Sequence, residues 1–298
     1  MKLSVIGYPR IGTLRELKFA SEAYFKHTIE QTELKQTANR LRKAHWKTQL
    51  EHGIEFIPSN DFSFYDTTLD TAVLLNIIPS RYQKLGLSPL DTYFAMARGY
   101  QGENGDVKAL AMKKWFHTNY HYIVPELEDE TEICLCGTKA FDEYLEAKEL
   151  GIETKPVILG AFTLLKLLKF SGNKKQKDVI DDFVIAYMDI VTKFHSIGVQ
   201  WIQFDEPYLV RDLSKEDIAL FHQIYSKILS VKHSVRVLLQ TYFGDIRDCY
   251  QEVCSLPFDG VGLDFVEGVK SLELIQTYGF PADKILFAGV INGKNIWR

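Results

Sequence analysis

Short, uninterrupted runs of apolar residues recur along the second half of the chain, and each is followed by a stretch with helical periodicity. Because the runs do not alternate with polar residues, they are typical of strands buried on both faces of a parallel sheet. The later runs are about 25 to 35 residues apart, which is the spacing of one strand–helix–strand unit. The strands predicted in this half are residues 156–160, 200–204, 235–240, 260–265 and 285–290.

The segment from Val179 to Ile197 has the clearest helical pattern. Its large apolar residues repeat at helical spacing and define one face: Phe183, Tyr187, Ile190, Val191 and Phe194. Gly198 follows at the position where a left-handed residue commonly ends a helix. The pattern predicts an amphipathic helix that covers the sheet.

The first half of the chain is less regular. Ser4–Gly7 and residues 55–58 are predicted strands, and the region from Leu14 to His52 between them is predicted to be helical. Residues 62–154 do not follow the strand–helix rhythm. We interpret them as an insertion of helices, with a short strand or hairpin around Ile133–Cys136.

These runs give seven strands, one fewer than a closed barrel of alternating strands and helices requires. The chain ends at Arg298 with no room for a further helix and strand, so the sequence looks cut short. The predicted fold is therefore α/β: an incomplete (β/α)8 TIM-type barrel that lacks its eighth strand and carries the helical insertion between strands 2 and 3. No low-complexity linker divides the chain, so residues 1–298 are predicted to form one domain.

Composition narrows the class of protein. The 298 residues are 46% hydrophobic and 25% charged with a net charge of −4, which is ordinary for a globular protein and disfavours a nucleic-acid-coating role. The longest apolar stretch, Val157 to Leu165, is too short to span a membrane. Four cysteines in a chain of this length, without a secretory signal, indicate a reducing cytoplasm.

Polar residues that follow predicted strands are the candidates for chemistry, because ligands of such folds lie beyond the carboxyl ends of the strands. The tandem Asp205-Glu206 is the sharpest signal. In an extended chain these two side chains point to opposite faces, so they are not a ready acid–base pair. One carboxylate could accept hydrogen bonds from a ligand at the barrel mouth, or it could form a salt bridge within the loops.

Cys134-x-Cys136 places two thiols on one face of a strand, where they could in principle meet a metal ion. The spacing is not that of a zinc site, and no histidine follows at a suitable distance. The sequence therefore favours two ordinary cysteines, and it shows neither a complete metal site nor a nucleophile–base set.

Two basic segments complete the candidates. Arg15 and Lys18 share a face at the start of the first long helix, whose free N–H groups add positive potential. Lys114 precedes the aromatic pair Trp115-Phe116. These residues could bind a ligand with carboxylates, or they could be solvated basic faces.

Several long segments of the chain resemble the N-terminal half of the cobalamin-independent methionine synthases, in order and over the whole length. The segments are GYPRIGTLRELKFA, KKWFHTNYHYIVPE, QFDEPYL, QTYFGD, GLDFV and AGVINGKNIWR. The family transfers a methyl group from 5-methyltetrahydropteroyltri-L-glutamate to L-homocysteine, forming L-methionine without cobalamin. Its members are longer, with two similar barrels packed face to face.

The resemblance implies specific roles. Arg15, Glu16, Leu17, Lys18 and Lys114 match the family's contacts to the folate substrate. The catalytic zinc, held by His, two Cys and Glu, and the homocysteine site belong to the C-terminal barrel, so no catalytic or metal-binding residue is assigned to this chain. The resemblance implies a cytoplasmic enzyme half that packs against its own C-terminal barrel, binds neither nucleic acid nor membrane, and is inactive by itself.

Two alternatives remain open at this point. A free-standing barrel enzyme, such as a hydrolase or a decarboxylase of the uroporphyrinogen type, would use Asp205 or Glu206 as an acid or base, and it should close its sheet within the sequence. A pure interaction module would respond to charge reversal at Arg15, Lys18 and Lys114 through partner binding and not through folate affinity.

Overall fold

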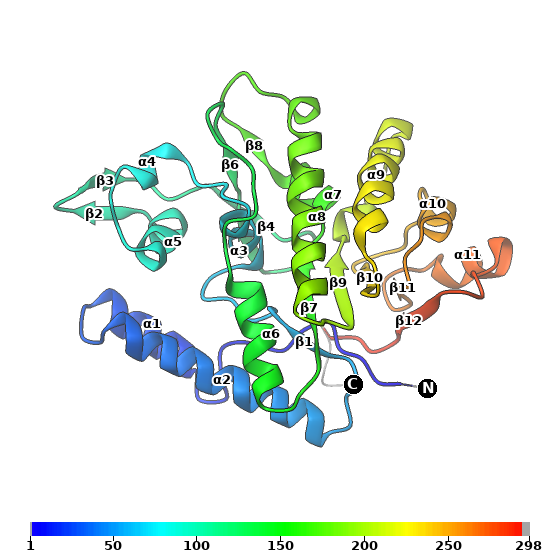
Figure 1. The fold of residues 1–298 in the computed structure, drawn as a ribbon, viewed down its shortest axis with the longest axis horizontal. Coiled ribbons are helices and arrows are strands. Elements are labelled where there is room, and N and C mark those ends of the chain that lie inside the picture. Colours follow the sequence, from blue (N-terminus) through cyan, green and yellow to red (C-terminus); the bar gives the residue numbers. More distant parts are fainter. Residues whose placement is uncertain (1, 294–298) are drawn as a thin grey trace.

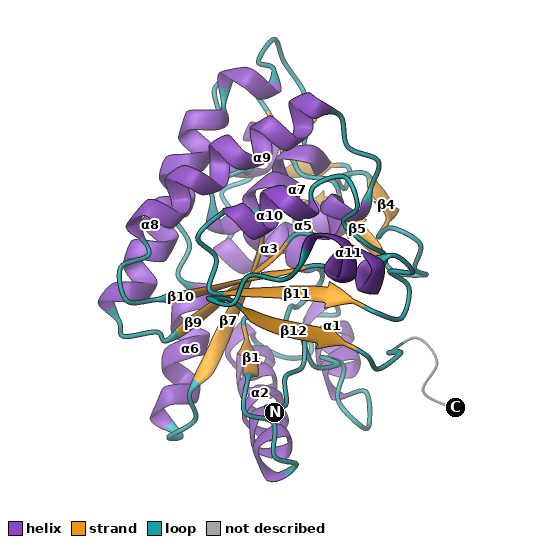
Figure 2. Cartoon of the chain, turned by 90° about the vertical axis from the view of Figure 1, so that its right-hand side faces the viewer, coloured by secondary structure: helices purple, strands orange, loops and turns teal. Residues whose placement is uncertain are grey.

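A curled sheet of six parallel strands forms the centre of the computed structural model, which describes residues 2–293 (Figures 1 and 2). Neighbouring strands pair in the order β1-β7-β9-β10-β11-β12. The strands are β1 (Ile57–Ser59), β7 (Thr154–Leu159), β9 (Trp201–Asp205), β10 (Arg236–Gln240), β11 (Gly260–Asp264) and β12 (Ile285–Gly289). Each lies within a few residues of a predicted run, which confirms the α/β class and the parallel sheet.

Helices follow the strands and pack on the sheet. Figure 2 shows α7 to α10 together on one side of the strands. The helices are α6 (Lys139–Glu149), α7 (Ala161–Leu167), α8 (Ile180–Ser196), α9 (Lys215–Ile228), α10 (Tyr250–Ser255) and α11 (Ser271–Tyr278). Short 3-10 turns lie at Gln176–Asp178, Pro207–Val210 and Leu229–Val231.

Helix α8 confirms the predicted amphipathic pattern. All five residues of the predicted apolar face are fully buried against the strands and α9. Gly198 has a φ of 79°, the left-handed conformation expected just beyond the end of the helix. Burial of this face, and not intrinsic helix propensity, stabilises a helix of this kind.

The inner face of the sheet is closed by three aromatic rings. Phe56, next to β1, lies 5.0 Å from Phe287 of β12 and 5.6 Å from Trp201 of β9, measured between ring centroids. Because β1 and β12 are the two outer strands of the sheet, this contact requires the sheet to curl until its edges meet.

The residues between β1 and β7 form a second unit with its own apolar core, which projects from the sheet in Figure 1. Two antiparallel hairpins, β2–β3 and β4–β5, lie here, and β6 pairs with β8. The elements between β1 and β7 in this unit are α3 (Thr67–Leu74), α4 (Ser80–Gln83), α5 (Pro89–Arg98), β2 (Tyr100–Gly102), β3 (Gly105–Val107), β4 (Met112–Lys114), β5 (His121–Ile123) and β6 (Glu126–Leu127). The partner of β6, β8 (Lys169–Phe170), follows α7 in the chain.

The helical region near the N-terminus consists of two helices, α1 (Glu16–Phe25) and α2 (Gln31–Glu51), which pack against each other. Two predictions for the first half were wrong. Ser4–Gly7 forms only a single bridge, Ser4 to Phe56, since the chain then turns so that the N–H of Tyr8 can reach Asp61. Ile133–Cys136 is extended but unpaired as a strand, because its N–H groups donate to the end of α3. The last five residues of the AGVINGKNIWR segment lie outside the described residues.

Two isoleucines of α8 test the contribution of the buried face. We expect Ile190→Ala to lower the free energy of unfolding by about 2–5 kcal/mol, because it leaves a cavity at a fully buried position. Ile185 of the same helix is 57% exposed, and Ile185→Ala is expected to change the free energy of unfolding by no more than about 0.5 kcal/mol. Urea unfolding followed by circular dichroism measures both, and equal effects would contradict the assigned faces.

Candidate functional site

A small polar cavity opens at the carboxyl ends of the parallel strands. Its volume is about 160 Å³, and it is lined by side chains that follow β1, β9 and β10 and by the N-terminal segment, among them Asn60, Asp61, Asp205 and Tyr242. Asp205 belongs to the tandem pair predicted from its position after an apolar run. A cavity of this size is smaller than the pockets of about 300–1,000 Å³ that enclose organic ligands of cofactor size.

A buried lysine lies beneath this cavity and connects its walls. The ammonium of Lys155, in β7, donates hydrogen bonds to the carbonyl oxygen of Val5 at 2.9 Å and to Gln203 of β9. Gln203 in turn donates from Nε2 to Asp205 Oδ1 at 2.7 Å, and the hydroxyl of Tyr242 donates to Asp205 Oδ2 at 3.2 Å. We call these five residues the Lys155 network.

Burial shifts the pKa values of this network toward the neutral forms. It lowers the pKa of Lys155 to about 8 and raises that of Asp205 to about 6, although the opposite charges partly counteract both shifts. Burial also raises the pKa of Asp61, which accepts a hydrogen bond from the N–H of Tyr8 at 2.7 Å. Asp205 is held by Gln203 and Tyr242, and Asp61 by the N–H of Tyr8, so each carboxylate has a hydrogen-bond donor within the fold.

Glu206 has a different role from its neighbour Asp205. Its carboxylate is fully buried and accepts hydrogen bonds from the backbone N–H groups of Phe162 and Thr163, at 2.9 and 2.7 Å, at the start of α7. The hydroxyl groups of Thr163 and Tyr225 also donate to it. The tandem pair therefore points to opposite sides, as an extended chain requires.

Gly160 makes room for this arrangement. A Cβ atom at Gly160 would lie 2.2 Å from Glu206 Oε1, so any larger residue would displace the carboxylate. Glu206 thus satisfies the N–H groups of a helix end, and it is unavailable as the catalytic acid or base of a free-standing barrel enzyme.

The predicted basic segment at the start of α1 divides into exposed and structural residues. Arg15 is exposed, and its backbone has a φ of 64°, a left-handed conformation that costs energy for a residue other than glycine. Lys18 is partly buried and lies 3.5 Å from Glu22. Leu17, by contrast, is buried in a small apolar cluster with Leu41 and other residues of α2.

Glu16 stabilises the turn that precedes α1. Its carboxylate accepts a hydrogen bond from the N–H of Leu14 at 3.0 Å and lies against Gly12, whose φ is 85°. The N–H of Leu17 donates to the carbonyl of Ile11 at 3.1 Å. The expectation that the first-turn N–H groups are free is therefore wrong for Leu17, and side-chain cations carry more of any anion binding there.

Lys114 is exposed at the end of β4, where it pairs with His121 across the hairpin. The connection that follows packs on the strand ends: the ring of Phe116 lies 5.7 Å from that of Phe243, after β10, and the guanidinium of Arg211 lies 5.1 Å from the same ring. The segment that leads to Arg15 is attached to the same carboxyl-end side of the sheet, because the N–H of Tyr8 donates to Asp61 after β1. Among residues 2–293, neither Arg15 nor Lys114 forms a salt bridge.

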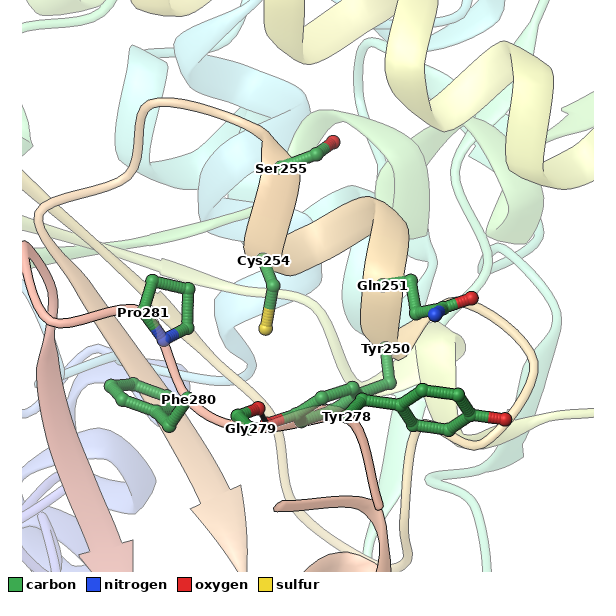
Figure 3. Close-up of a pocket in the computed structure, with 8 residues that line it drawn as sticks. All are labelled: Tyr250, Gln251, Cys254, Ser255, Tyr278, Gly279, Phe280 and Pro281. Atoms are coloured by element: carbon green, nitrogen blue, oxygen red, sulfur yellow. Dashed lines mark hydrogen bonds between the residues drawn. The ribbon is translucent and has the colours of Figure 1, made fainter. Parts of the chain in front are cut away.

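A larger pocket lies elsewhere, between α10 and the segment that connects α11 to β12 (Figure 3). Its volume is about 370 Å³. The thiol of Cys254 points into it, and the hydroxyl of Tyr250 donates to the carbonyl of Gly279 at 2.6 Å. Among the described residues that line this pocket there is no lysine, arginine, histidine or carboxylate, so it offers no charged side chain for ionic recognition.

Sequence reasoning missed the centre of the strand-end site. Lys155 lies inside β7, directly before the predicted run 156–160, and Gln203 lies inside the predicted run 200–204. Asp70 on α3 also lines the cavity. A lysine within a buried strand was the available signal, because a buried ammonium requires hydrogen-bond partners. For a metal, the described part of the chain offers no group of three or more His, Cys, Asp or Glu side chains that could hold one.

The curled parallel sheet with a polar cavity at its strand ends defines an α/β protein of the barrel type. The solved structure of the putative vitamin-B12-independent methionine synthase from Listeria monocytogenes shares this fold, with a TM-score of 0.68 at 14% identity, covering 98% of this chain and 80% of that one. A B12-independent methionine synthase from Shewanella sp. W3-18-1, solved in complex with selenomethionine, aligns with a TM-score of 0.59 at 13% identity. The aligned region covers 87% of this chain and 72% of that one.

The family model described as "Cobalamin-independent synthase, N-terminal domain" matches residues 2–298, so the chain belongs to this family. A 5-methyltetrahydropteroyltriglutamate–homocysteine methyltransferase from Campylobacter jejuni subsp. doylei is 59% identical over the full chain, and one from Streptococcus sanguinis is 55% identical. The chain spans 39% and 40% of the length of these two relatives.

The pH dependence of stability tests the burial of Glu206. Burial raises the pKa of Glu206 from its ordinary value near 4.5 to about 7, so between these values the folded chain holds a proton that the unfolded chain has lost. We expect the free energy of unfolding to fall as pH rises through this window, by up to about 1.4 kcal/mol per pH unit from this group.

Glu206→Gln isolates that contribution from those of Asp205 and Asp61. The advantage of the natural chain over this variant is expected to shrink between pH 5 and pH 7.5 in urea unfolding. Glu216→Gln, at an exposed position of α9, is the matched control and should leave the pH profile unchanged. Parallel profiles for the natural chain and the Glu206 variant would contradict the assignment.

Proposed function

We propose that this chain is the folate-tail-binding and scaffolding half of an enzyme that transfers a methyl group from 5-methyltetrahydropteroyltri-L-glutamate to L-homocysteine, forming L-methionine. The observation that carries the proposal is the family match over residues 2–298, together with relatives named for this reaction. In this proposal the chain is an N-terminal, incomplete (β/α)8 barrel with an insertion at about residues 62–154, and it packs against a C-terminal barrel.

The zinc of the proposed enzyme is assigned to the C-terminal barrel. The residues described here do not fit a zinc site: the thiols of Cys134 and Cys136 have no third His, Cys, Asp or Glu ligand near them. We therefore derive no catalytic step through zinc in this half. Cobalamin has no role in the proposed reaction, as the family's description states.

Arg15, Lys18 and Lys114 are proposed to bind the triglutamate tail, which is a string of carboxylates. Two features support this role: Arg15 and Lys114 are exposed without a salt bridge among the described residues, and both basic segments are anchored on the carboxyl-end side of the sheet. Arginine and lysine donate charge-assisted hydrogen bonds to carboxylates. Each partly exposed contact is expected to contribute on the order of 1 kcal/mol.

Glu16 and Leu17 are proposed to contribute to the folate site by positioning. Glu16 holds the turn before α1 through the N–H of Leu14, and Leu17 anchors the first turn of α1 in the apolar cluster with α2. Together they fix the backbone between the two cations Arg15 and Lys18.

A cytoplasmic location is also part of the proposal, since the reaction consumes soluble cellular metabolites. Within residues 2–293, no helix combines the length and hydrophobicity needed to cross a bilayer. The near balance of 35 basic and 39 acidic residues supports a small-molecule substrate in preference to nucleic acid or a membrane surface.

Calorimetric titration with methyltetrahydrofolate bearing three glutamates, compared with the monoglutamate form, tests the tail site. We expect the triglutamate form to bind more tightly at low salt, with affinity that falls as salt rises, because screening weakens exposed ion pairs. Arg15→Ala, Lys18→Ala and Lys114→Ala are each expected to weaken binding about fivefold.

Lys113→Ala provides a matched control for Lys114→Ala. Both lysines are exposed on β4, but they point to opposite faces of the hairpin, so only Lys114 should affect binding. The proposed tail site would be contradicted if the two folates bound with equal affinity or if neither bound. It would also be contradicted if Lys113→Ala and Lys114→Ala lowered the affinity equally.

The proposal also predicts that this chain alone has no methyltransferase activity. We expect the purified chain to form no methionine from the triglutamate folate and homocysteine, because the residues proposed to bind zinc and homocysteine lie outside it. Chromatographic detection of methionine, with a full-length relative as the positive control, measures this. Methionine formation by the chain in the absence of any full-length enzyme would overturn the proposed division of labour.

A further inference from the structure

Two thiols outside the proposed folate site lie in contact. The Sγ atoms of Cys134 and Cys136 are 3.1 Å apart, and neither cysteine forms a disulfide. The Cys136 side chain is exposed and that of Cys134 is partly buried, so solutes can reach the pair. The extended backbone of residues 133–136 puts both side chains on the same side, as alternation predicts.

The backbone around the two thiols is fixed on both sides. The N–H groups of Cys136 and Gly137 donate to the carbonyl of Leu74, at 2.9 and 3.1 Å, and the side-chain amide of Asn76 donates to the carbonyl of Glu132 at 2.9 Å. Between the thiols, Leu135 packs against the main apolar core. The fold therefore holds the two sulfur atoms together before any reaction occurs.

A close backbone contact shows how tightly this segment packs on α3. A Cβ atom at Gly137 would lie 2.9 Å from the Cα atom of Leu74, so the two backbones touch at this point. Holding two reactive groups at contact distance raises the effective concentration of one toward the other.

We propose that Cys134 and Cys136 form a reversible dithiol–disulfide site that reacts with small disulfides such as oxidised glutathione. The thiolate of exposed Cys136 attacks the small disulfide, forming a mixed disulfide and releasing one small thiol. The thiolate of Cys134 then attacks the sulfur of Cys136 and releases the second small thiol. The protein loses two protons and two electrons, and the small disulfide gains both as two thiols.

The environment of the pair favours this order of events. The hydrogen bond with Cys136 raises the pKa of Cys134 to about 11, so Cys134 retains its proton until Cys136 enters the mixed disulfide and this hydrogen bond is lost. Closure requires the sulfur atoms to approach by about 1 Å, from contact to the S–S bond length near 2.05 Å. The side-chain torsions of two adjacent thiols can supply that movement while the backbone hydrogen bonds persist.

The other two cysteines provide an internal comparison. Cys249 is buried, and burial raises its pKa beyond the ordinary thiol range; burial also raises the pKa of the half-buried Cys254. Buried thiols of raised pKa react slowly with disulfides, because the thiolate is the nucleophile. Oxidation should therefore begin at Cys136, the exposed cysteine, and involve Cys134, which lies in contact with it.

Trypsin separates the two pairs, which makes the test direct. Cleavage after Lys114 and Lys139 yields residues 115–139 with Cys134 and Cys136, and cleavage after Arg247 and Lys270 yields residues 248–270 with the other two cysteines. The native chain is equilibrated with oxidised and reduced glutathione at several ratios, quenched with acid, alkylated and analysed by mass spectrometry. We expect peptide 115–139 to lose two hydrogen atoms reversibly, while peptide 248–270 stays reduced.

Two variants and one unfolded control keep the proposal falsifiable. Cys134→Ser should accumulate the glutathione mixed disulfide at Cys136. In Cys136→Ser, the remaining Cys134 should react with oxidised glutathione at least tenfold more slowly than Cys136 does in Cys134→Ser. In urea the natural chain should need at least tenfold more oxidised glutathione to form the same disulfide, since the positioning is lost. Three results would overturn the proposal. These are one glutathione attached to each of the two thiols, oxidation confined to peptide 248–270, and the same requirement for oxidised glutathione in the native and the unfolded chain.

Discussion

The buried ammonium of Lys155 is the constraint on which the strand-end side of the molecule depends. A charge that is removed from water needs several hydrogen-bond partners, and Lys155 finds them on two other segments: the backbone at Val5 and the side chain of Gln203. Gln203 extends the connection to Asp205, which Tyr242 also holds. One buried charge thereby fixes the relative positions of the N-terminal segment, β7, β9 and the connection after β10.

The position of the proposed tail site follows from this constraint. The N-terminal segment contributes only one strand bridge, so the Lys155 network and the Tyr8–Asp61 hydrogen bond hold it against the strand ends. From there the chain turns at Gly12 and begins α1, which places Arg15 and Lys18 beside the same side of the sheet. The aromatic contact between Phe56 and Phe287 provides the matching constraint on the inner face, where it brings the two edges of the sheet together.

The sequence predicts those parts of the structure that depend on local pattern. Continuous apolar runs locate the six parallel strands to within a few residues, and the apolar repeat locates α8. Both succeed because a buried face requires apolar residues at regular spacing in the sequence. Alternation also predicts that the thiols of Cys134 and Cys136 share a side. The hairpins β2–β3 and β4–β5 have no such apolar pattern, since they are short and largely exposed.

The site is harder to predict because its partners are distant in the sequence. Lys155 contacts residues about 50 and 150 positions away, and no local pattern shows that a lysine in an apolar strand will meet Gln203 and the backbone of Val5. The two carboxylates of Asp205-Glu206 are visible in the sequence, and their opposite directions follow from an extended backbone. Their different environments, a polar cavity for Asp205 and a helix end for Glu206, depend on which elements pack on each side.

The charges of the strand-end side also determine where a polyanionic tail can bind. Three carboxylates, Asp61, Asp70 and Asp205, line the cavity, and the hydrogen bonds of Lys155 are directed to Val5 and Gln203 beneath it. A chain of glutamates would meet like charges there, which costs energy in a partly buried site. The exposed cations Arg15 and Lys114 lie outside the cavity, so a tail bound by them remains on the surface, where each contact is weak and sensitive to salt. Affinity in the proposed site would have to come from several cations acting together, so a tail of three glutamates is expected to bind more tightly than a single glutamate.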